Sequence, residues 1–215
     1  VSQTDGSKQD VFENFNLTVR EGELVSLVGQ SGIGKTTLVN IIAGYLCPVS
    51  GSVLVNGRET RGPGMDRIVI NQVHDLFDWM TVRQNMELVC SNQERIDQYL
   101  LMTGLNHAGN RYPYELSGGM KKRLSLARAL SADSQFIIMD EPFSSLDYQL
   151  REKLQESLRD IVLKSKKTVL FVTHDIEEAI FLSERICILS GKPTNIKKEI
   201  AIPFGKIRES SLRDT

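Results

Sequence analysis

A glycine-rich segment between a strand-like run and a helical pattern constrains the fold of this chain more than any other feature. Residues 29–36 read Gly-Gln-Ser-Gly-Ile-Gly-Lys-Thr and match the pattern G-x-x-x-x-G-K-S/T at every fixed position. The apolar run Leu24–Val28 precedes the segment, and a helical pattern over Lys35–Gly44 follows it. In such a strand–loop–helix unit, successive backbone N–H groups and the helix N-terminus bind phosphate groups. The sequence therefore predicts a phosphate-binding loop in an α/β core.

The loop predicts roles for individual side chains. Lys35 is expected to reach the β- and γ-phosphates of a nucleotide, and the Thr36 hydroxyl is expected to ligate Mg²⁺. The competing interpretation is an ordinary glycine-rich turn, which the flanking strand and helix argue against. The residues predicted to bind the nucleotide are those of the loop and the threonine after it: Gly29, Gln30, Ser31, Gly32, Ile33, Gly34, Lys35, Thr36 and Thr37.

Two acidic residues stand at the end of another apolar run. The segment Phe136–Met139 leads directly into Asp140 and Glu141. At the carboxyl end of a buried strand, Asp140 is expected to face the metal, directly or through water. Glu141 is then placed to polarise an attacking water as a general base. A strand that ends in a solvated acidic turn is the alternative, and the presence of the phosphate loop argues against it.

A second anion-binding helix N-terminus is predicted at Ser117-Gly118-Gly119. Ser117 can cap this helix, and the two glycines leave its N–H groups uncovered. A chain with one phosphate loop has no obvious need for a second such seat, so a composite site is the economical explanation. In that site, these three residues bind a nucleotide that another copy holds. A capped helix with a flexible lead-in is the alternative.

Composition and charge exclude several classes of protein. Lysines and arginines total 26 against 27 acidic residues, a net charge of −1, so no overall basic field favours nucleic acid or anionic lipid. Cys47, Cys90 and Cys187 are far apart and are expected to be reduced packing residues. The basic run Lys121–Arg123 is expected to be a solvated helix face. No stretch approaches about 18 uninterrupted apolar residues, so no membrane-spanning helix is expected.

The alternation of strand-like and helical segments predicts a mainly parallel α/β sheet. Five short apolar runs are expected to be its buried strands: Leu24–Val28, Ile68–Ile70, Phe136–Met139, Val169–Val172 and Arg185–Leu189. Two further segments, Val11–Val19 and Ser52–Val55, predict an antiparallel β edge, with Asn56-Gly57 as a turn.

A helical insertion interrupts this pattern. From Thr81 to Gly104 the sequence predicts helices without intervening strands, and Thr81 with Gln84 forms a capping box at the start. The insertion is expected to run on to about Leu130. The predicted organisation is a single domain over residues 1–215, with an α/β core at 1–74 and 131–215 and a helical subdomain at about 75–130.

Taken together, these segments resemble the nucleotide-binding subunit of ATP-binding-cassette (ABC) transporters. Ser117-Gly118-Gly119 stands where that family has its signature, with Met120 in place of the commoner glutamine. Gln72 matches the glutamine of the Q-loop, Pro142–Asp147 resembles the D-loop, and His174 matches the switch histidine. The motifs follow the family's order and cover nearly the whole chain. The resemblance implies a P-loop NTPase core with the subdomains of an ABC ATPase.

Three further segments resemble the nitrate, sulfonate, taurine and bicarbonate importers within this family: Tyr112–Leu116, Asp140–Phe143 and Thr173–Ala179. An export or lipoprotein-release cassette, and an ABC ATPase that acts in translation or DNA repair, are the alternatives. The family usually stacks adenine on an aromatic residue near the start of its β edge. Asp5 falls near that position and Phe12 is the nearest aromatic, so the adenine contact is left unassigned.

The resemblance also implies a mechanism and partners. Two copies, or one copy and a close paralogue, close around two Mg-ATP, and hydrolysis reopens them and drives membrane permease subunits. An extracytoplasmic solute-binding protein is an indirect partner, nucleic acid is not one, and the expected location is the cytoplasmic face of the inner membrane. The residues implied are Glu141, His174, Gln72 and Lys35 in catalysis, Thr36, Gln72 and Asp140 at the metal, and Ser117, Gly118, Gly119 and Asp147 at the nucleotide.

Phe77 and Trp79 leave two interpretations open. They either fill the core between the α/β part and the insertion, or form part of a socket for the permease. The cargo is not determined, because a cassette of this family contacts ATP and the permease.

Overall fold

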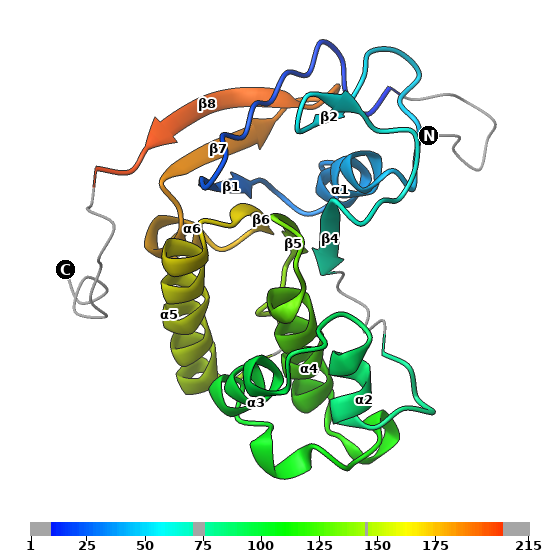
Figure 1. The fold of residues 1–215 in the computed structure, drawn as a ribbon. Coiled ribbons are helices and arrows are strands. Elements are labelled where there is room, and N and C mark those ends of the chain that lie inside the picture. Colours follow the sequence, from blue (N-terminus) through cyan, green and yellow to red (C-terminus); the bar gives the residue numbers. More distant parts are fainter. Residues whose placement is uncertain (1–9, 71–75, 145, 204–215) are drawn as a thin grey trace.

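A six-stranded sheet forms the centre of the molecule, and helices cover both of its faces (Figure 1). The structure is a computed structural model that describes residues 10–70, 76–144 and 146–203. The strands of the sheet are β1 (Leu24–Val28), β4 (Arg67–Ile70), β5 (Phe136–Asp140), β6 (Thr168–Thr173), β7 (Arg185–Ser190) and β8 (Asn195–Ala201). Their order is β4-β5-β6-β1-β7-β8, in which the first five run parallel and β8 is antiparallel to β7. The predicted mainly parallel sheet and its five buried strands are confirmed.

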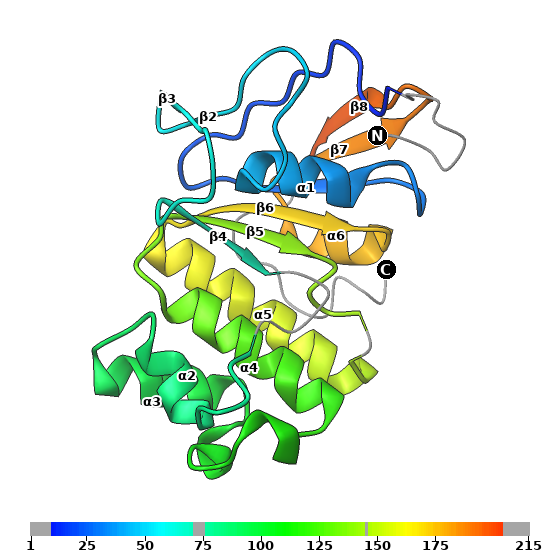
Figure 2. The ribbon, with the colours of Figure 1, turned by 90° about the vertical axis from the view of Figure 1, so that its right-hand side faces the viewer.

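Successive side chains of the central strands pack into two different cores, one on each face of the sheet. On one face, Val25 and Leu27 of β1 pack with helix α1 (Lys35–Ala43). On the other face, Leu24 packs with the helices α4 (Gly118–Ser131) and α5 (Tyr148–Ser165). Helix α6 (Ile176–Leu182) lies on this second face as well. Figures 1 and 2 show α1 on one side of the sheet and α4 and α5 on the other.

The antiparallel edge differs from the prediction. A hairpin of β2 (Leu54–Val55) and β3 (Arg58–Glu59) does form around Asn56-Gly57, where both turn residues have positive φ. Val11–Val19, however, is not a strand, and in the described residues it makes a single bridge, between Phe12 and Thr194. Its alternating apolar side chains pack onto the core beside α1. The alternation therefore comes from the burial of these side chains and not from strand pairing. The antiparallel edge of the main sheet is β8.

The predicted helical insertion contains α2 (Val82–Glu87) and α3 (Gln93–Met102), which pack with α4. The predicted capping box is confirmed, because the Thr81 hydroxyl accepts from the Gln84 N–H at 3.2 Å and the Gln84 Oε1 accepts from the Thr81 N–H at 2.9 Å. Gly104 follows α3 with a φ of 65°, a left-handed conformation that glycine adopts easily. Two short 3₁₀ turns, Asn106–Ala108 and Pro113–Glu115, lead on towards α4.

One continuous core joins the helical insertion to the sheet. Val82 and Met86 of α2 and Leu100 of α3 belong to the same buried cluster as Leu24 of β1 and Phe171 of β6. The insertion is therefore packed against the α/β part without a separate core of its own in the described residues. Among the helices that the structure describes, none has the length and apolar composition that a bilayer crossing requires.

Candidate nucleotide-binding site

The predicted phosphate loop leads from β1 into α1 at the carboxyl edge of the sheet (Figure 2). Gly34, just before α1, has a φ of 103°, a left-handed conformation that favours glycine. Among the described residues, no side chain caps α1, so its first N–H groups have no capping oxygen. Lys35 Nζ donates to the carbonyl oxygens of Gly29 at 2.7 Å and Gln30 at 3.1 Å. The loop therefore curls around its lysine and presents an uncapped helix N-terminus to an anion.

The predicted metal ligands Thr36 and Asp140 meet between α1 and β5. Thr36 Oγ1 donates to Asp140 Oδ2 at 2.9 Å. Asp140 is almost fully buried, and burial raises its pKa, as does the charge of Glu141, while the Thr36 hydroxyl and Lys35 oppose the shift. A buried carboxylate beside a hydroxyl offers the hard oxygen ligands that Mg²⁺ prefers, and a cation there would offset the cost of burying the charge. These residues therefore fit a Mg²⁺ ion.

The structure brings the predicted base and the predicted switch histidine together. His174 Nδ1 lies 3.1 Å from Glu141 Oε1, although the two residues follow different strands, β6 and β5. Glu141 has a φ of 49°, which is uncommon for a residue other than glycine, and its N–H donates to the Val172 carbonyl at 2.9 Å. Backbone conformations of this kind cluster at functional sites because the surrounding fold must hold them in place. Glu141 is thus fixed at the carboxyl edge with its carboxylate against an exposed imidazole.

The expectation that Lys121–Arg123 form a solvated basic helix face is wrong for Lys122. It is 6% exposed, and its Nζ donates to the carbonyl oxygen of Ser144 at 2.7 Å and to the Ser144 Oγ at 2.6 Å. The sequence held a signal for this burial, because Lys122 lies four residues before the buried Leu126 on α4. Arg123 also turns inward, and its guanidinium donates to the Thr103 carbonyl at 3.0 Å.

The predicted second anion seat lies at the start of α4. Ser117 is the N-cap of the helix, and its Oγ accepts from the Met120 N–H at 3.3 Å. A Cβ added to Gly118 would meet open space, so nothing in the described chain demands a glycine there, whereas a Cβ on Gly119 would lie 3.9 Å from the Leu146 side chain. Because α4 and α1 pack on opposite faces of the sheet, this seat begins a helix on the face opposite the helix that follows the phosphate loop.

The remaining predicted residues have other positions. Asp147 caps α5, where its Oδ1 accepts from the Leu150 N–H at 3.0 Å. Gln72 and Asp5 lie outside the described residues. Phe12 is half-buried beside the phosphate loop, and its ring would lie 3.1 Å from a Cβ added to Gly34. Of the three cysteines, Cys90 and Cys187 are buried as expected, but Cys47 is exposed.

A buried carboxylate next to this site was not predicted. Glu178 on α6 accepts from Thr173 Oγ1 at 2.8 Å and from the Gln155 side-chain amide at 3.1 Å. Thr173 in turn accepts from the Asp175 N–H at 3.0 Å, so this network holds the segment around His174. Burial raises the pKa of Glu178, and the charge of Asp175 adds to the shift. The position of Glu178 among the apolar residues that α6 buries is the sequence signal that could have indicated its burial.

Replacing Glu178 with Gln is expected to change how stability depends on pH. The folded state holds the Glu178 proton at pH values at which an unfolded chain, with its pKa near 4.5, has released it. Wild-type stability therefore falls as the pH rises from 4.5 through the folded-state pKa, and Glu178→Gln lacks this loss. The variant should gain stability relative to wild type across that interval. Urea unfolding at several pH values measures the gain, with the exposed Glu177→Gln as control, and parallel curves would contradict the expectation.

Comparison with protein families matches residues 12–144, more than half of the sequence, to the family described as ABC transporter. The chain belongs to the ABC transporter family. This ABC transporter subunit is 44% identical over 199 residues to the nitrate import ATP-binding protein NrtD of Synechocystis sp., covering 89% of this chain and 75% of the relative. It is 42% identical over 215 residues to the aliphatic sulfonates import ATP-binding protein SsuB of Bacillus licheniformis, covering 97% and 84%. The taurine import ATP-binding protein TauB of Pelagibacter ubique is 39% identical over 210 residues, covering 94% and 79%.

Solved structures of ABC cassettes have the same fold. A dimeric structure of MJ0796, a bacterial ABC transporter cassette, has a TM-score of 0.80 at 32% identity, over 91% of this chain and 92% of that one. A dimeric post-hydrolysis state of MJ0796 bound to ADP and Pi has a TM-score of 0.79 at the same identity and coverage. These likenesses confirm the predicted fold class and the ATP-binding and ATP-hydrolysing activity of this ABC subunit.

Proposed function

We propose that this ABC ATPase energises a membrane importer of a small anion or an organic sulfur or nitrogen compound. The observation that carries the proposal is that predicted site residues follow three adjacent parallel strands and meet at one edge of the sheet. Lys35 and Thr36 come after β1, Asp140 ends β5, Glu141 follows it, and His174 comes after β6. Named relatives at 39–44% identity are import ATP-binding proteins for nitrate, taurine and aliphatic sulfonates. Each of these cargoes carries an oxyanion group, which supports the cargo class.

In the proposed site, each side chain has one task. Lys35 and the uncapped N-terminus of α1 bind the phosphates by charge-assisted hydrogen bonds. Thr36 and Asp140, with Gln72, would hold Mg²⁺, which neutralises phosphate charge when bound. Glu141 accepts a proton from the attacking water, and His174 orients the Glu141 carboxylate through their 3.1 Å contact.

The site is proposed to be completed by a second ABC subunit. The seat at Ser117-Gly118-Gly119 begins a helix that packs on the face of the sheet opposite α1, which supports its binding a nucleotide held by another chain. The open space around Gly118 supports the approach of a group from another molecule. The dimeric assemblies of the similar cassette MJ0796 give the same support. Asp147, which caps α5, would lie in the same interface.

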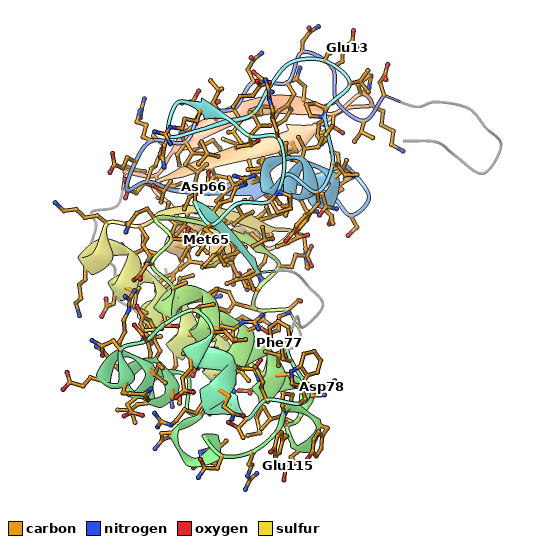
Figure 3. All side chains as sticks on the ribbon, turned by 45° about the vertical axis from the view of Figure 1, so that its right-hand side comes forward. Glu13, Met65, Asp66, Phe77, Asp78 and Glu115 are labelled. Atoms are coloured by element: carbon orange, nitrogen blue, oxygen red, sulfur yellow. The ribbon has the colours of Figure 1, made fainter. Side chains whose placement is uncertain are left out.

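The permease is proposed to bind at an exposed aromatic patch, which we define as Phe77 and Trp79. Their rings pack edge to face at 5.3 Å, and the Arg128 guanidinium lies 5.7 Å from the Phe77 ring centre. Buried Asn85 fixes the loop, because its Nδ2 donates to the carbonyls of Phe77 at 3.1 Å and Met80 at 3.0 Å. Trp79 is 72% exposed, so the interpretation that it fills the core is wrong. Figure 3 shows Phe77 and Asp78 at the surface of the helical part.

A fixed, exposed tryptophan is the residue type that anchors protein interfaces. The proposed partners are therefore permease subunits on the cytoplasmic face of the membrane, which would link the ATPase indirectly to a solute-binding protein on the other side. The patch supports this arrangement because its loop lies directly after residues 71–75, the segment that contains the predicted Q-loop glutamine.

Replacing Trp79 with Ala is expected to abolish assembly with the permease and to leave the melting temperature of the isolated subunit nearly unchanged. The exposed ring contributes little to the core, so its removal should cost little stability. Removal of a buried tryptophan ring would instead cost about 3–5 kcal/mol. Pull-down of a co-expressed permease subunit, read beside thermal unfolding, measures both effects. Leu54→Ala on β2, an exposed apolar residue outside the helical part, is the matched control. A large fall in melting temperature would reject the docking role, and failure of the wild type to retain the permease would reject the proposed function.

A further inference from the structure

Four hydrogen bonds connect Lys122 of the signature helix α4, through Ser144, to the backbone of Glu141 within one chain. Lys122, in the second turn of α4, donates to both the carbonyl oxygen and the hydroxyl of Ser144. The Ser144 hydroxyl then donates to the Glu141 carbonyl at 3.0 Å, and the Ser144 N–H donates to the same oxygen at 3.2 Å. Lys122 therefore contacts the loop that begins at Glu141. The helix that carries Lys122, α4, has the second anion seat in its first turn.

The charge of Lys122 is directed into the site and not to solvent. The side chain is buried, and burial lowers its pKa, while the carboxylates of Glu141, Glu178 and Asp140 are close enough to oppose that shift. A buried ammonium is costly unless its donors are paired, and here Ser144 accepts two of its bonds. Lys121, its neighbour on the same helix, is half-exposed and shows none of these contacts in the described residues.

The loop to which Lys122 is hydrogen-bonded also packs against the anion seat. A Cβ added to Gly119 would lie 3.9 Å from the Leu146 side chain, so the start of α4 packs against the far end of the same loop. Glu141 itself has the left-handed backbone that only surrounding contacts can maintain. A displacement of the first turns of α4 would therefore be passed through Lys122 and Ser144 to the backbone that aims the Glu141 carboxylate.

We infer that Lys122 is a positioning residue that couples the signature seat of one copy to the Glu141 base of the same copy. This inference rests on the proposed composite site, in which the seat holds the nucleotide of the second copy. Binding of that nucleotide at Ser117-Gly118-Gly119 would be communicated to Glu141, which serves the chain's own nucleotide. The two nucleotides of a dimer are then linked through one lysine in each chain.

The test compares Lys122→Met with Lys121→Met. Methionine keeps an unbranched chain one atom shorter but removes the donors to Ser144, so the Glu141 backbone loses an anchor while the phosphate loop is untouched. For Lys122→Met we expect kcat for Mg-ATP hydrolysis to fall by about tenfold or more, the Kd for ATP to stay within about twofold, and the Hill coefficient to fall toward unity. Lys121→Met should match the wild type in all three quantities.

A purely structural role predicts a different pattern. It would lower the melting temperature and raise the Kd together with the loss of kcat, or leave kcat unchanged in a folded variant, and either result would overturn the inference. If Lys122→Met does not fold, Ser144→Ala decides, because it deletes the hydroxyl that joins Lys122 to the Glu141 carbonyl, while the bond that remains ends at the Ser144 carbonyl. An unchanged kcat and Hill coefficient in Ser144→Ala would then overturn the inference.

The wild-type protein separates failure of this inference from failure of the proposed function. If the wild type hydrolyses Mg-ATP cooperatively and the variants do so equally well, only the role of Lys122 is rejected. If the wild type hydrolyses ATP without cooperativity and stays monomeric at saturating Mg-ATP, the composite site is rejected, and the coupling through Lys122 with it.

Discussion

Replacing Glu141 with Gln is expected to lower kcat for ATP hydrolysis by about 10²–10⁴-fold while ATP binding stays nearly intact. Glutamine keeps the shape of the side chain but cannot accept a proton from water, and the contact with His174 at 3.1 Å holds it in the same place. The phosphate-binding atoms of Lys35 and α1 are unchanged. Loss of the Glu141 charge also removes one of the influences that raise the pKa of Asp140, so the metal site is not weakened.

Steady-state hydrolysis and a separate ATP-binding titration measure the two effects of Glu141→Gln. Glu156→Gln, on the exposed side of α5, is the matched control and should hydrolyse ATP at the wild-type rate. A loss of kcat below about tenfold would reject Glu141 as the base. The variant should also accumulate an ATP-bound dimer in size-exclusion chromatography. A variant that stays monomeric at saturating Mg-ATP would count against the composite site.

Replacing Lys35 with Ala is expected to weaken ATP binding by about 10- to 150-fold, the equivalent of a charge-assisted contact of about 1.5–3 kcal/mol. Two effects act in the same direction. The variant loses the ammonium that faces the phosphates, and the carbonyls of Gly29 and Gln30 lose the donor around which the loop curls. Turnover should fall as well, because the phosphates are no longer held in position.

Titration with a fluorescent ATP analogue measures the change in Kd for Lys35→Ala. Lys153→Ala, an exposed lysine of α5, controls for the loss of one positive charge and should bind as the wild type does. Thermal unfolding of both variants checks that the loop change leaves the fold intact. An unchanged Kd for Lys35→Ala would mean that the predicted phosphate loop is not the nucleotide site.

The parallel part of the fold could be predicted because buried parallel strands read as short apolar runs between helical patterns. Two elements could not be predicted, for different reasons. Val11–Val19 alternates like a strand, but its apolar side chains pack on a core while its backbone stays almost unpaired to the sheet. β8 is an edge strand with exposed charges such as Lys197 and Lys198, so it lacks the apolar run that identified the others.

The predicted site residues come together because a general rule of parallel sheets places the carboxyl ends of neighbouring strands at one edge. That rule is enough to expect Asp140, Glu141 and His174 near the phosphate loop. It does not reveal Lys122 and Ser144, because their contact depends on how α4 packs over the loop after β5, and sequence spacing carries no information about that packing. The apolar stripe of α4 held a signal that Lys122 is covered, which the expectation of a solvated helix face missed, and that stripe does not indicate what covers it.

The packing of α1 and α4 on opposite faces of the sheet also sets when ATP is consumed. In the proposed composite site, each nucleotide needs half-sites from two chains, because the helices that begin at the phosphate loop and at the seat are packed on opposite faces of one sheet. A lone subunit therefore holds ATP without a complete site, and futile hydrolysis is suppressed at low abundance. A permease that binds two subunits side by side raises their effective concentration, and so makes consumption of ATP conditional on an assembled transporter.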